Sequence, residues 1–200
     1  MNGIGIAASE LILGGQRSGK SRRAELLARQ WLDANPAHRA VLIATAQPWD
    51  EEMRQRIARH QADRAERVPG MQTAEVHSAL GEALAQWSQP LTLVVVDCLT
   101  LWLTNLLMPM ESHDGQNAFA GQDNAALADR PIQTLLQAIA QATGPVVLVG
   151  NEIGMGVIPM GAQVRAFVDT LGRLNQDVAR SCARVTLMAA GLPLTLKDTP

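Results

Sequence analysis

The chain has 200 residues, 47% of them hydrophobic and 18% charged, with a formal net charge of -2 at pH 7. This length suits one compact domain with a sizeable core. The nearly balanced charge argues against a protein that coats nucleic acid or binds membranes through a basic surface. The two cysteines, Cys98 and Cys182, have no metal-ligand spacing and favour a reducing cytoplasm. We expect no secretory signal and no membrane span.

Short apolar runs alternate with helix-compatible segments along the chain. Strands are expected at residues 10–14, 39–45, 71–76, 91–96, 145–150, 184–189 and 194–197. Helices are expected at residues 19–33, 50–67, 78–87, 99–107, 125–142 and 161–182. Residues 1–9 are expected to form a loose extension, and the polar residues 109–124 a flexible loop. The alternation predicts one α/β domain over residues 1–200, with a mostly parallel sheet covered by helices on both faces.

The segment that organises the chain is residues 14–21, G-G-Q-R-S-G-K-S, which lies between an expected strand and an expected helix. It matches the phosphate-binding pattern G-x-x-x-x-G-K-[ST] in its strand–loop–helix setting. The candidate nucleotide-binding residues are Gly14, Gly15, Gln16, Arg17, Ser18, Gly19, Lys20 and Ser21. Lys20 is expected to reach the outer phosphates and the Ser21 hydroxyl to hold Mg²⁺. The alternative, a glycine-rich turn that only caps a helix, is disfavoured by the flanking strand and helix.

An acidic residue follows the most strand-like segment of the chain. Asp97 comes directly after residues 91–96, L-T-L-V-V-V, where the Mg²⁺-organising carboxylate of phosphate-loop folds lies. Asp97 is also a candidate N-cap for the next helix, and the two roles are compatible. A lysine and an aspartate alone define only a nucleotide-binding module. The N-K-x-D pattern of guanine recognition is absent, which excludes a switch-type GTPase.

Two further segments have both a plain and a chemical interpretation. In the helix expected at 50–67, helical spacing places Met53, Ile57 and His60 on one face, which favours a partly buried structural histidine. The other hypothesis is that the His60 imidazole attacks phosphorus and forms a covalent intermediate. Residues 151–156, N-E-I-G-M-G, follow an expected strand and are typical of a substrate loop, or of an ordinary glycine-rich connection.

These motifs occur together in one known family. The chain resembles the bifunctional adenosylcobinamide kinase/adenosylcobinamide-phosphate guanylyltransferases of cobalamin biosynthesis. The segments that carry the resemblance are 14–21, I-A-T-A-Q at 43–47, D-E-E-M-x-x-R-I-x-x-H at 50–60, T-A-E at 73–75, T-N-L-L at 104–107 and N-E-I-G-M-G at 151–156. The match continues in the last long helix at Arg165, Phe167, Asp169, Gly172, Asn175 and Gln176. It covers residues 11–197 and implies a P-loop NTPase fold of the RecA-like type.

The resemblance implies two reactions. The aminopropanol hydroxyl of adenosylcobinamide takes the γ-phosphate of ATP or GTP; GTP then guanylylates a histidine, and the GMP passes to adenosylcobinamide phosphate to give adenosylcobinamide-GDP. The implied catalytic residues are His60 and Lys20, and the implied metal ligands of Mg²⁺ are Ser21 and Asp97. The nucleotide contacts implied beyond the phosphate loop are Thr45, Ala46, Gln47, Gln61, Ala62, Asp63, Arg64, Glu75 and Asp97.

The resemblance also implies a corrinoid substrate and a homo-oligomer, because relatives form ring-like trimers. It differs from the family at two places: Asp97 stands where some relatives have glutamate, and the 109–124 loop is longer than in compact relatives. Two alternatives remain at this stage. One is a kinase-only P-loop enzyme in which His60 is structural, and the other is a RecA-like nucleotide-gated binding subunit. No nucleic-acid partner is expected, because no basic, aromatic-bearing pattern is present.

Overall fold

The computed structural model of the chain describes residues 5–108 and 124–199. The loop expected at 109–124 therefore lies almost wholly outside the described residues. Its last residue, Asn124, is the first residue of a helix instead. Among the described residues, no helix is both long enough and apolar enough to cross a membrane.

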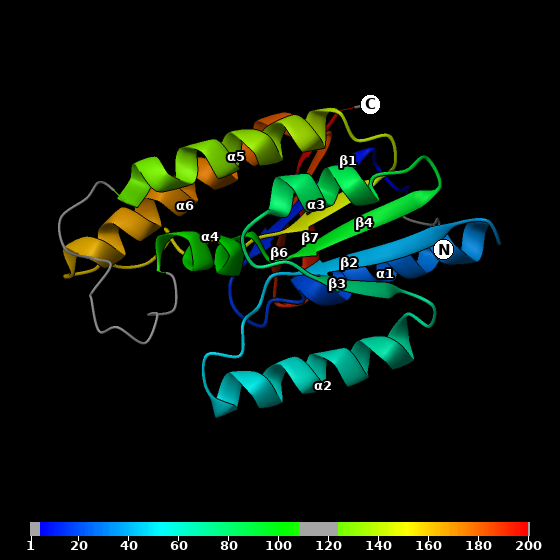
Figure 1. The fold of residues 1–200 in the computed structure, drawn as a ribbon, viewed down its shortest axis with the longest axis horizontal. Helices are drawn as coiled ribbons and strands as arrows, with labels where there is room; N and C mark the ends of the chain where they lie inside the picture. The colour runs from blue at the N-terminus through cyan, green and yellow to red at the C-terminus, as the bar shows by residue number, and fades with distance from the viewer. Residues whose placement is uncertain (1–4, 109–123, 200) are drawn as a thin grey trace.

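A seven-stranded sheet forms the centre of the molecule, with the strand order β3-β2-β4-β5-β1-β6-β7 (Figure 1). The strands are β1 (Ser9–Gly14), β2 (Arg39–Ala44), β3 (Gln72–Glu75), β4 (Thr92–Asp97), β5 (Val146–Val149), β6 (Arg184–Ala189) and β7 (Leu192–Asp198). All neighbouring strands are parallel except β6 and β7, which are antiparallel. The predicted, mostly parallel sheet is thus confirmed, and each strand lies within a few residues of its expected position.

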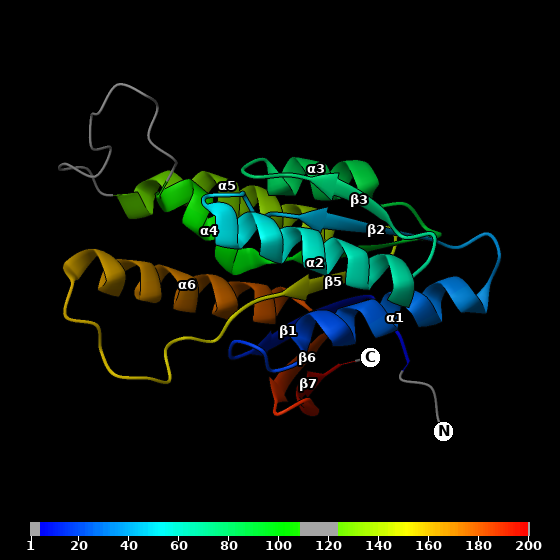
Figure 2. The same cartoon turned by 90° about the horizontal axis from the view of Figure 1, so that it is seen from below.

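Helices cover both faces of this sheet. They are α1 (Lys20–Ala34), α2 (Glu51–Arg67), α3 (Leu80–Trp87), α4 (Leu99–Leu107), α5 (Asn124–Ala140) and α6 (Ala162–Ser181). Helices α3 to α6 lie on one face, and α1 lies on the other with α2 outside it, as Figures 1 and 2 show from two sides. Both faces of the parallel strands are therefore buried, as expected for a sheet built from crossover connections.

Alternate side chains of the central strands supply two separate cores. Leu11, Val94 and Val96 pack with α3 to α6, whereas Ile12 and Val95 pack with α1. This division follows from the two-residue period of a strand, which directs successive side chains to opposite faces. The side chains on both faces of these strands are apolar, so each face of the sheet packs against its helices through an apolar core.

The N-terminal extension is shorter and better held than expected. Ser9 already belongs to β1, and its Oγ accepts a hydrogen bond from Ala183 N at 3.0 Å. The Ala8 carbonyl accepts from Val146 N at 3.0 Å, and Ile6 packs against the core on the α1 side. The expected end of the extension is therefore too late at Ser9, because Ala8 and Ser9 already continue the sheet pairing beyond the apolar run.

Candidate functional site

The carboxyl ends of β1 to β5 meet at one edge of the sheet because these strands are parallel. The registers place Glu75 beside Ala44, Ala44 beside Asp97, and Asp97 beside Val149. Strand β1 lies next to β5, and the phosphate-loop segment follows it. Candidate residues that are far apart in the chain are thus brought to the same edge, which is where open α/β sheets bind their ligands.

The loop after β1 has a backbone that its glycines make possible. Gly14 has φ 153°, and a Cβ there would lie 2.5 Å from the Met188 carbonyl oxygen. Gly19 has φ 101° and Arg17 has φ 57°, both in the region that favours glycine. The turn between β6 and β7 supports the loop, because Gly191 N donates to the Ser18 carbonyl at 3.0 Å. The loop is thus shaped before any ligand binds.

Lys20, the first residue of α1, extends back over this loop. Its Nζ donates to the Gly15 carbonyl at 2.6 Å, and the residue is only 8% exposed. Burial lowers the pKa of Lys20, and the neighbouring Cys98 and Asp97 partly oppose that effect. A phosphate is a better partner for this ammonium than one backbone carbonyl, because a charge-assisted hydrogen bond is stronger than a neutral one.

The residues at the end of β4 show whether Asp97 is the N-cap of the following helix, an alternative that the sequence left open. The N-cap of α4 is Cys98, whose Sγ accepts from Leu101 N at 3.5 Å. The capping alternative for Asp97 is therefore wrong. The Asp97 carboxylate, which is half-buried, lies close enough to Lys20 to act on its charge. This leaves Asp97 available for the metal role that its position predicts.

Thr45, an expected nucleotide contact, has a structural role here. Its side chain is fully buried, and its Oγ1 donates to Cys98 O at 2.7 Å and accepts from Cys98 N at 2.8 Å. These bonds tie the end of β2 to the end of β4. The next two expected contacts, Ala46 and Gln47, are half-buried beside it.

Asn105 on α4 joins two segments at the same edge. Its Nδ2 donates to the Thr45 carbonyl at 2.8 Å and to the His77 carbonyl at 3.0 Å. One buried amide therefore holds both the chain leaving β2 toward α2 and the chain leaving β3 toward α3. Sequence reasoning noted the T-N-L-L segment but assigned Asn105 no role, because its two partners are 28 and 60 residues away.

Helix α2 is the least buried helix among the described residues for which burial is known. It contains no buried residue, and Asp50 caps its first turn by accepting from Met53 N at 2.7 Å. His60, in the middle of α2, is exposed. The interpretation of His60 as a partly buried structural histidine is therefore wrong, because the face that it shares with Met53 and Ile57 is not covered by the sheet. The imidazole is accessible to a substrate.

A hollow of about 370 Å³ lies between α2 and β3, which we call the α2–β3 hollow. The residues that line it are Gln61, Arg64, Ala65, Val68, Met71, Thr73 and Glu75. Three expected nucleotide contacts, Gln61, Arg64 and Glu75, thus meet at one place. The other two expected contacts on α2 do not line it: Ala62 is exposed, and Asp63 is 3.2 Å from Arg67 in an ion pair along the helix.

The segment after β5 lies directly beside the phosphate loop. Glu152 N donates to the Gly14 carbonyl at 3.2 Å, and Asn151 N donates to Thr100 Oγ1 at 2.9 Å. Asn175 on α6 donates to the Asn151 carbonyl at 3.1 Å. Three elements thus hold this segment in place. Sequence reasoning left the N-E-I-G-M-G motif open between a substrate loop and an ordinary glycine-rich connection, and placed none of its residues in the site.

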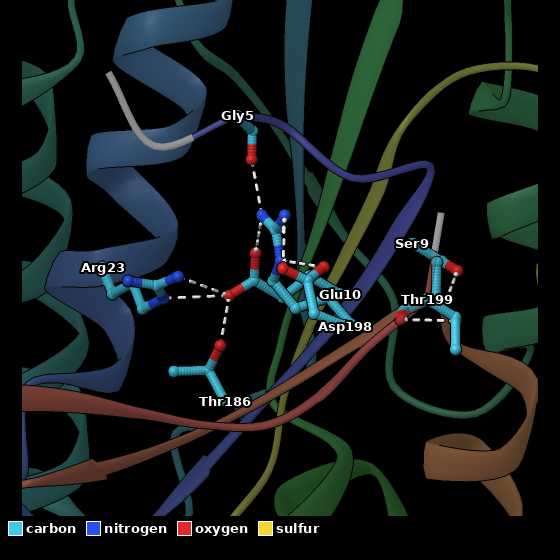
Figure 3. Close-up of polar contacts among 9 residues, drawn as sticks. Gly5, Ser9, Glu10, Arg23, Thr186, Asp198 and Thr199 are labelled. Atoms are coloured by element: carbon cyan, nitrogen blue, oxygen red, sulfur yellow. Dashed lines mark hydrogen bonds and ion pairs between the residues drawn. The ribbon is translucent and has the colours of Figure 1, made fainter. Parts of the chain in front are cut away.

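A buried charge network supports α1 from the opposite edge of the sheet (Figure 3). Glu10 is 1% exposed, and its Oε1 accepts from Arg23 Nε at 2.9 Å and from Thr186 Oγ1 at 2.8 Å. Its Oε2 lies 3.7 Å from Arg184 Nη1, and Arg184 also pairs with Asp198 at 2.9 Å. Arg23 is in the first turn of α1, so the network ties the helix that follows the phosphate loop to β1 and β6. Sequence reasoning missed it, although a glutamate within an apolar strand was a signal.

These features define the class of the protein. A glycine-rich loop joins the strand β1 to helix α1, a buried lysine covers the loop, and an aspartate ends a strand two positions away in a mostly parallel sheet. This is the arrangement of a P-loop nucleotide-binding protein. The solved structure of the flagellar accessory protein FlaH from Methanocaldococcus jannaschii has the same general fold, with a TM-score of 0.52 and 11% identity, over 99% of this chain and 82% of that one.

Sequence comparison identifies the family within this class. Residues 10–196 match the family described as cobinamide kinase/cobinamide phosphate guanyltransferase, and the chain belongs to that family. It is 42% identical to the bifunctional adenosylcobalamin biosynthesis protein CobP of Pseudomonas aeruginosa over 191 residues, which cover 96% of this chain and 98% of the relative. It is 35% identical to the bifunctional adenosylcobalamin biosynthesis protein CobU of Salmonella typhimurium, over 94% of this chain and 98% of that relative. The family resemblance seen in the motifs is confirmed.

Proposed function

We propose that this protein phosphorylates adenosylcobinamide with ATP or GTP and then transfers GMP from GTP, through a histidine–GMP intermediate, to give adenosylcobinamide-GDP. Family membership over residues 10–196 supports the pair of activities. The observation that carries the proposal is the exposed His60, on a helix that also lines a hollow with three expected nucleotide contacts. An accessible imidazole beside such a hollow is suited to nucleophilic attack on a bound nucleotide.

The phosphoryl-transfer step depends on positioning and on charge neutralisation. The loop N–H groups and Lys20 would hold the β- and γ-phosphates, with Nζ leaving the Gly15 carbonyl for a phosphate oxygen. Ser21 and Asp97 would hold Mg²⁺, which neutralises developing charge on the phosphates when bound. A hydroxyl and a carboxylate fit this ion, because Mg²⁺ binds through one or two protein oxygens together with phosphates and water. In residues 5–108 and 124–199, no three His, Cys, Asp or Glu side chains form a metal-binding group, so a site completed by substrate is the kind that these residues support.

In the guanylyl-transfer step, a His60 ring nitrogen would attack the α-phosphorus of GTP, and pyrophosphate would leave. The phosphate of adenosylcobinamide phosphate would then attack the same phosphorus, and the nitrogen–phosphorus bond would break. We assign Glu75, Gln61 and Arg64 to binding GTP during this step, because they line the α2–β3 hollow together. The Glu75 carboxylate suits the N–H donors of guanine, and the Arg64 guanidinium suits a phosphate.

Covalent labelling tests the proposal. The protein is incubated with Mg²⁺ and GTP labelled either at the α- or at the γ-phosphate, and is then denatured. We expect label to be retained from the α-position alone, to be acid-labile and base-stable, and to be lost in His60→Ala. The matched control is His38→Ala, because His38 stacks on Trp31 at 3.6 Å in the connection between α1 and β2. GTP binding without label would favour the kinase-only enzyme, and label that persists in His60→Ala would assign the covalent step to another residue.

We also propose that the protein is a cytoplasmic homo-oligomer. The segment between β5 and α6 exposes Met155, Val157, Ile158 and Met160 by 77% or more, and apolar surface of this kind marks an interface. We propose that a second copy of the chain covers this surface, because the family that the chain resembles forms ring-like trimers. Both cysteines are free and buried, which suits a reducing compartment. Light scattering that gives a monomer mass would contradict the oligomer.

A further inference from the structure

The segment that follows β5 lies at the centre of the phosphate site. Strand β5 is between β1, which leads into the phosphate loop, and β4, which ends at Asp97. The residues after Val149 therefore leave the sheet between the proposed phosphate grip and the proposed metal ligand. Glu152 is the ionisable residue of this segment, and none of the described ion pairs involves it.

The Glu152 side chain is held in one orientation. Its Oε1 accepts from Gly154 N at 2.9 Å, and its Oε2 lies 3.5 Å from Asn175 Nδ2. Its own backbone N–H is bonded to the Gly14 carbonyl at 3.2 Å. Asn175 is 4% exposed and is itself fixed by its bond to the Asn151 carbonyl. The Glu152 carboxylate is thus half-buried, held in one orientation and without a cationic partner in the described ion pairs, and its backbone is bonded to the first glycine of the phosphate loop.

A negative charge at this place has a cost. A triphosphate bound in the loop would be repelled by Glu152, since like charges repel each other more strongly near a protein surface than in bulk water. A glutamine would accept the same hydrogen bond from Gly154 N without that repulsion. The loop geometry alone therefore does not require a carboxylate, and a role that uses its basicity explains it better.

Glu152 lines a groove that we call the α6 groove, with a volume of about 550 Å³. Its lining residues are Leu13, Glu152, Gly172, Asn175, Gln176, Ala179, Arg180, Val185, Leu196 and Lys197. Apolar side chains alternate there with two amides, and the two cations are on the last turns of α6 and on β7. This lining suits a molecule with apolar surface and amide groups better than it suits a second polyphosphate.

Gly172 also lines this groove. It is within α6, where glycine is a less favourable residue than alanine. A Cβ built on Gly172 has no heavy atom within 4 Å outside its own helix. Close packing therefore does not require glycine at this position, and a side chain there would extend into the space of the groove.

We propose that the α6 groove binds the amide-bearing arm of the corrinoid acceptor and that Glu152 is the base for its hydroxyl group in phosphoryl transfer. The acceptor oxygen forms a bond to the γ-phosphorus, and the bond from the γ-phosphorus to the β,γ-bridging oxygen breaks. The nucleoside diphosphate leaves with the electron pair, and the hydroxyl proton passes to the Glu152 carboxylate, which returns it to water. This assignment rests on the proposed kinase function and adds the acceptor side of its site.

The first test is Glu152→Gln, which keeps the size of the side chain and its acceptor for Gly154 N. We expect phosphorylation of adenosylcobinamide to fall by about 100-fold or more, the range for loss of a general base. Nucleotide affinity should not fall, because the variant removes a charge that repels the triphosphate, and α-label incorporation at His60 should not decrease, because it does not use the acceptor hydroxyl. The matched control is Glu82→Gln, an exposed carboxylate on α3 that should leave all of these unchanged.

The second test fills the groove. Gly172→Leu should fold, since leucine is a better helix former than glycine, and should raise the KM for adenosylcobinamide by tenfold or more with the KM for ATP unchanged. Three results would count against the assignment: a wild-type kinase rate in Glu152→Gln, an equal loss of His60 labelling in that variant, or an unchanged acceptor KM in Gly172→Leu. Wild-type protein that does not phosphorylate the corrinoid would instead overturn the proposed function, and this inference with it.

Discussion

Helices α1 and α2 lie on the same side of the sheet, yet the structure holds them very differently. Six residues of α1 are buried, including Leu27 and Ala28, and Arg23 ties its first turn to Glu10. No residue of α2 is buried, and its one described ion pair with α1 joins Arg67 to Glu25 at 2.9 Å. The helix that grips phosphate is therefore part of the core, whereas the helix that carries His60 is attached at its surface.

This difference matches the two proposed steps. Phosphoryl transfer needs donors that are already in place, because reorganising them during the reaction would raise its barrier. Guanylyl transfer through His60 requires the histidine to meet first GTP and then the corrinoid phosphate. A helix with few buried contacts can change position at low free-energy cost. If burial sets this difference, substitutions on α1 should cost more stability than substitutions on α2.

The largest effect is expected at the phosphate grip. Lys20→Met should lower both activities by about 100-fold or more, because it removes a charged donor from the phosphates. The same variant should unfold at a higher urea concentration at pH 7, since it no longer buries an ammonium group. Steady-state kinetics and urea denaturation measure the two effects.

The stability gain in Lys20→Met should depend on pH. Burial lowers the native pKa of Lys20 below its ordinary value of 10.5, so the unfolded chain binds more protons than the native one between those two values. Wild-type stability should therefore rise relative to that of the variant as the pH increases through this window toward 10.5. A difference that stays constant from pH 7 to pH 10 would contradict this account.

The next effect concerns the network beneath α1. Glu10→Gln should lower the free energy of unfolding by about 3–5 kcal/mol, because it leaves the buried Arg23 without its charged partner. Glu51→Gln is the control on α2, where Glu51 pairs with Arg54 at 2.9 Å on an exposed surface; its cost should be at most about 0.5 kcal/mol. Urea denaturation measures both, and equal costs would remove the contrast between the two helices.

A smaller effect is expected at the connection to α2. Asn105→Leu should cost about 1–3 kcal/mol, because the Thr45 and His77 carbonyls lose their buried donor. The control is Asn35→Ala, which removes a bond of 2.9 Å to Ala37 N in an exposed turn and should cost less. Denaturation gives the totals, and faster hydrogen exchange near residues 45–47 in Asn105→Leu alone would locate the change. An Asn105→Leu variant as stable as the wild type would show that water replaces the amide.

The smallest effect is at the link between the helices. Arg67→Gln should change the overall stability by about 1 kcal/mol or less, since the Arg67 side chain is 47% exposed. Hydrogen exchange should nevertheless increase across residues 51–67 and remain unchanged across residues 20–34. Exchange that increases equally in both helices would mean that they open as one unit.

The sequence was sufficient for the sheet and the phosphate loop. Residues 11–13 of β1 and the strands β4 and β5 are apolar on both faces and can be recognised by composition alone, and the glycine–lysine spacing permits few other interpretations. A local sequence pattern does not show, however, which face of a helix its neighbours will bury. Met53 and Ile57 have helical spacing and predict a buried face, but only the assembled sheet shows that α1 already occupies that side of the core.

Hydrogen bonds and ion pairs between residues far apart in the chain could not be predicted from local sequence patterns either. Thr45 resembles a nucleotide contact in its motif, yet its hydroxyl is bonded to Cys98, 53 residues away. Glu10, Arg23 and Arg184 each looked like an ordinary charged residue near an element end. Their pairing depends on the β1–β6 register, in which Glu10 lies beside Arg184, and that register could not be derived before the strand order was known.

The buried Glu10 network also limits how this sequence can change over generations. Loss of the glutamate alone leaves Arg23 and Arg184 facing each other's charge, and loss of Arg23 alone leaves a carboxylate in the core. Either single change costs more than a neutral replacement of the whole group would. Substitutions at these positions should therefore arise together, as correlated changes across β1, α1 and β6. A chain that reaches an apolar version of this core must pass through a weakened ancestor or exchange several residues at once.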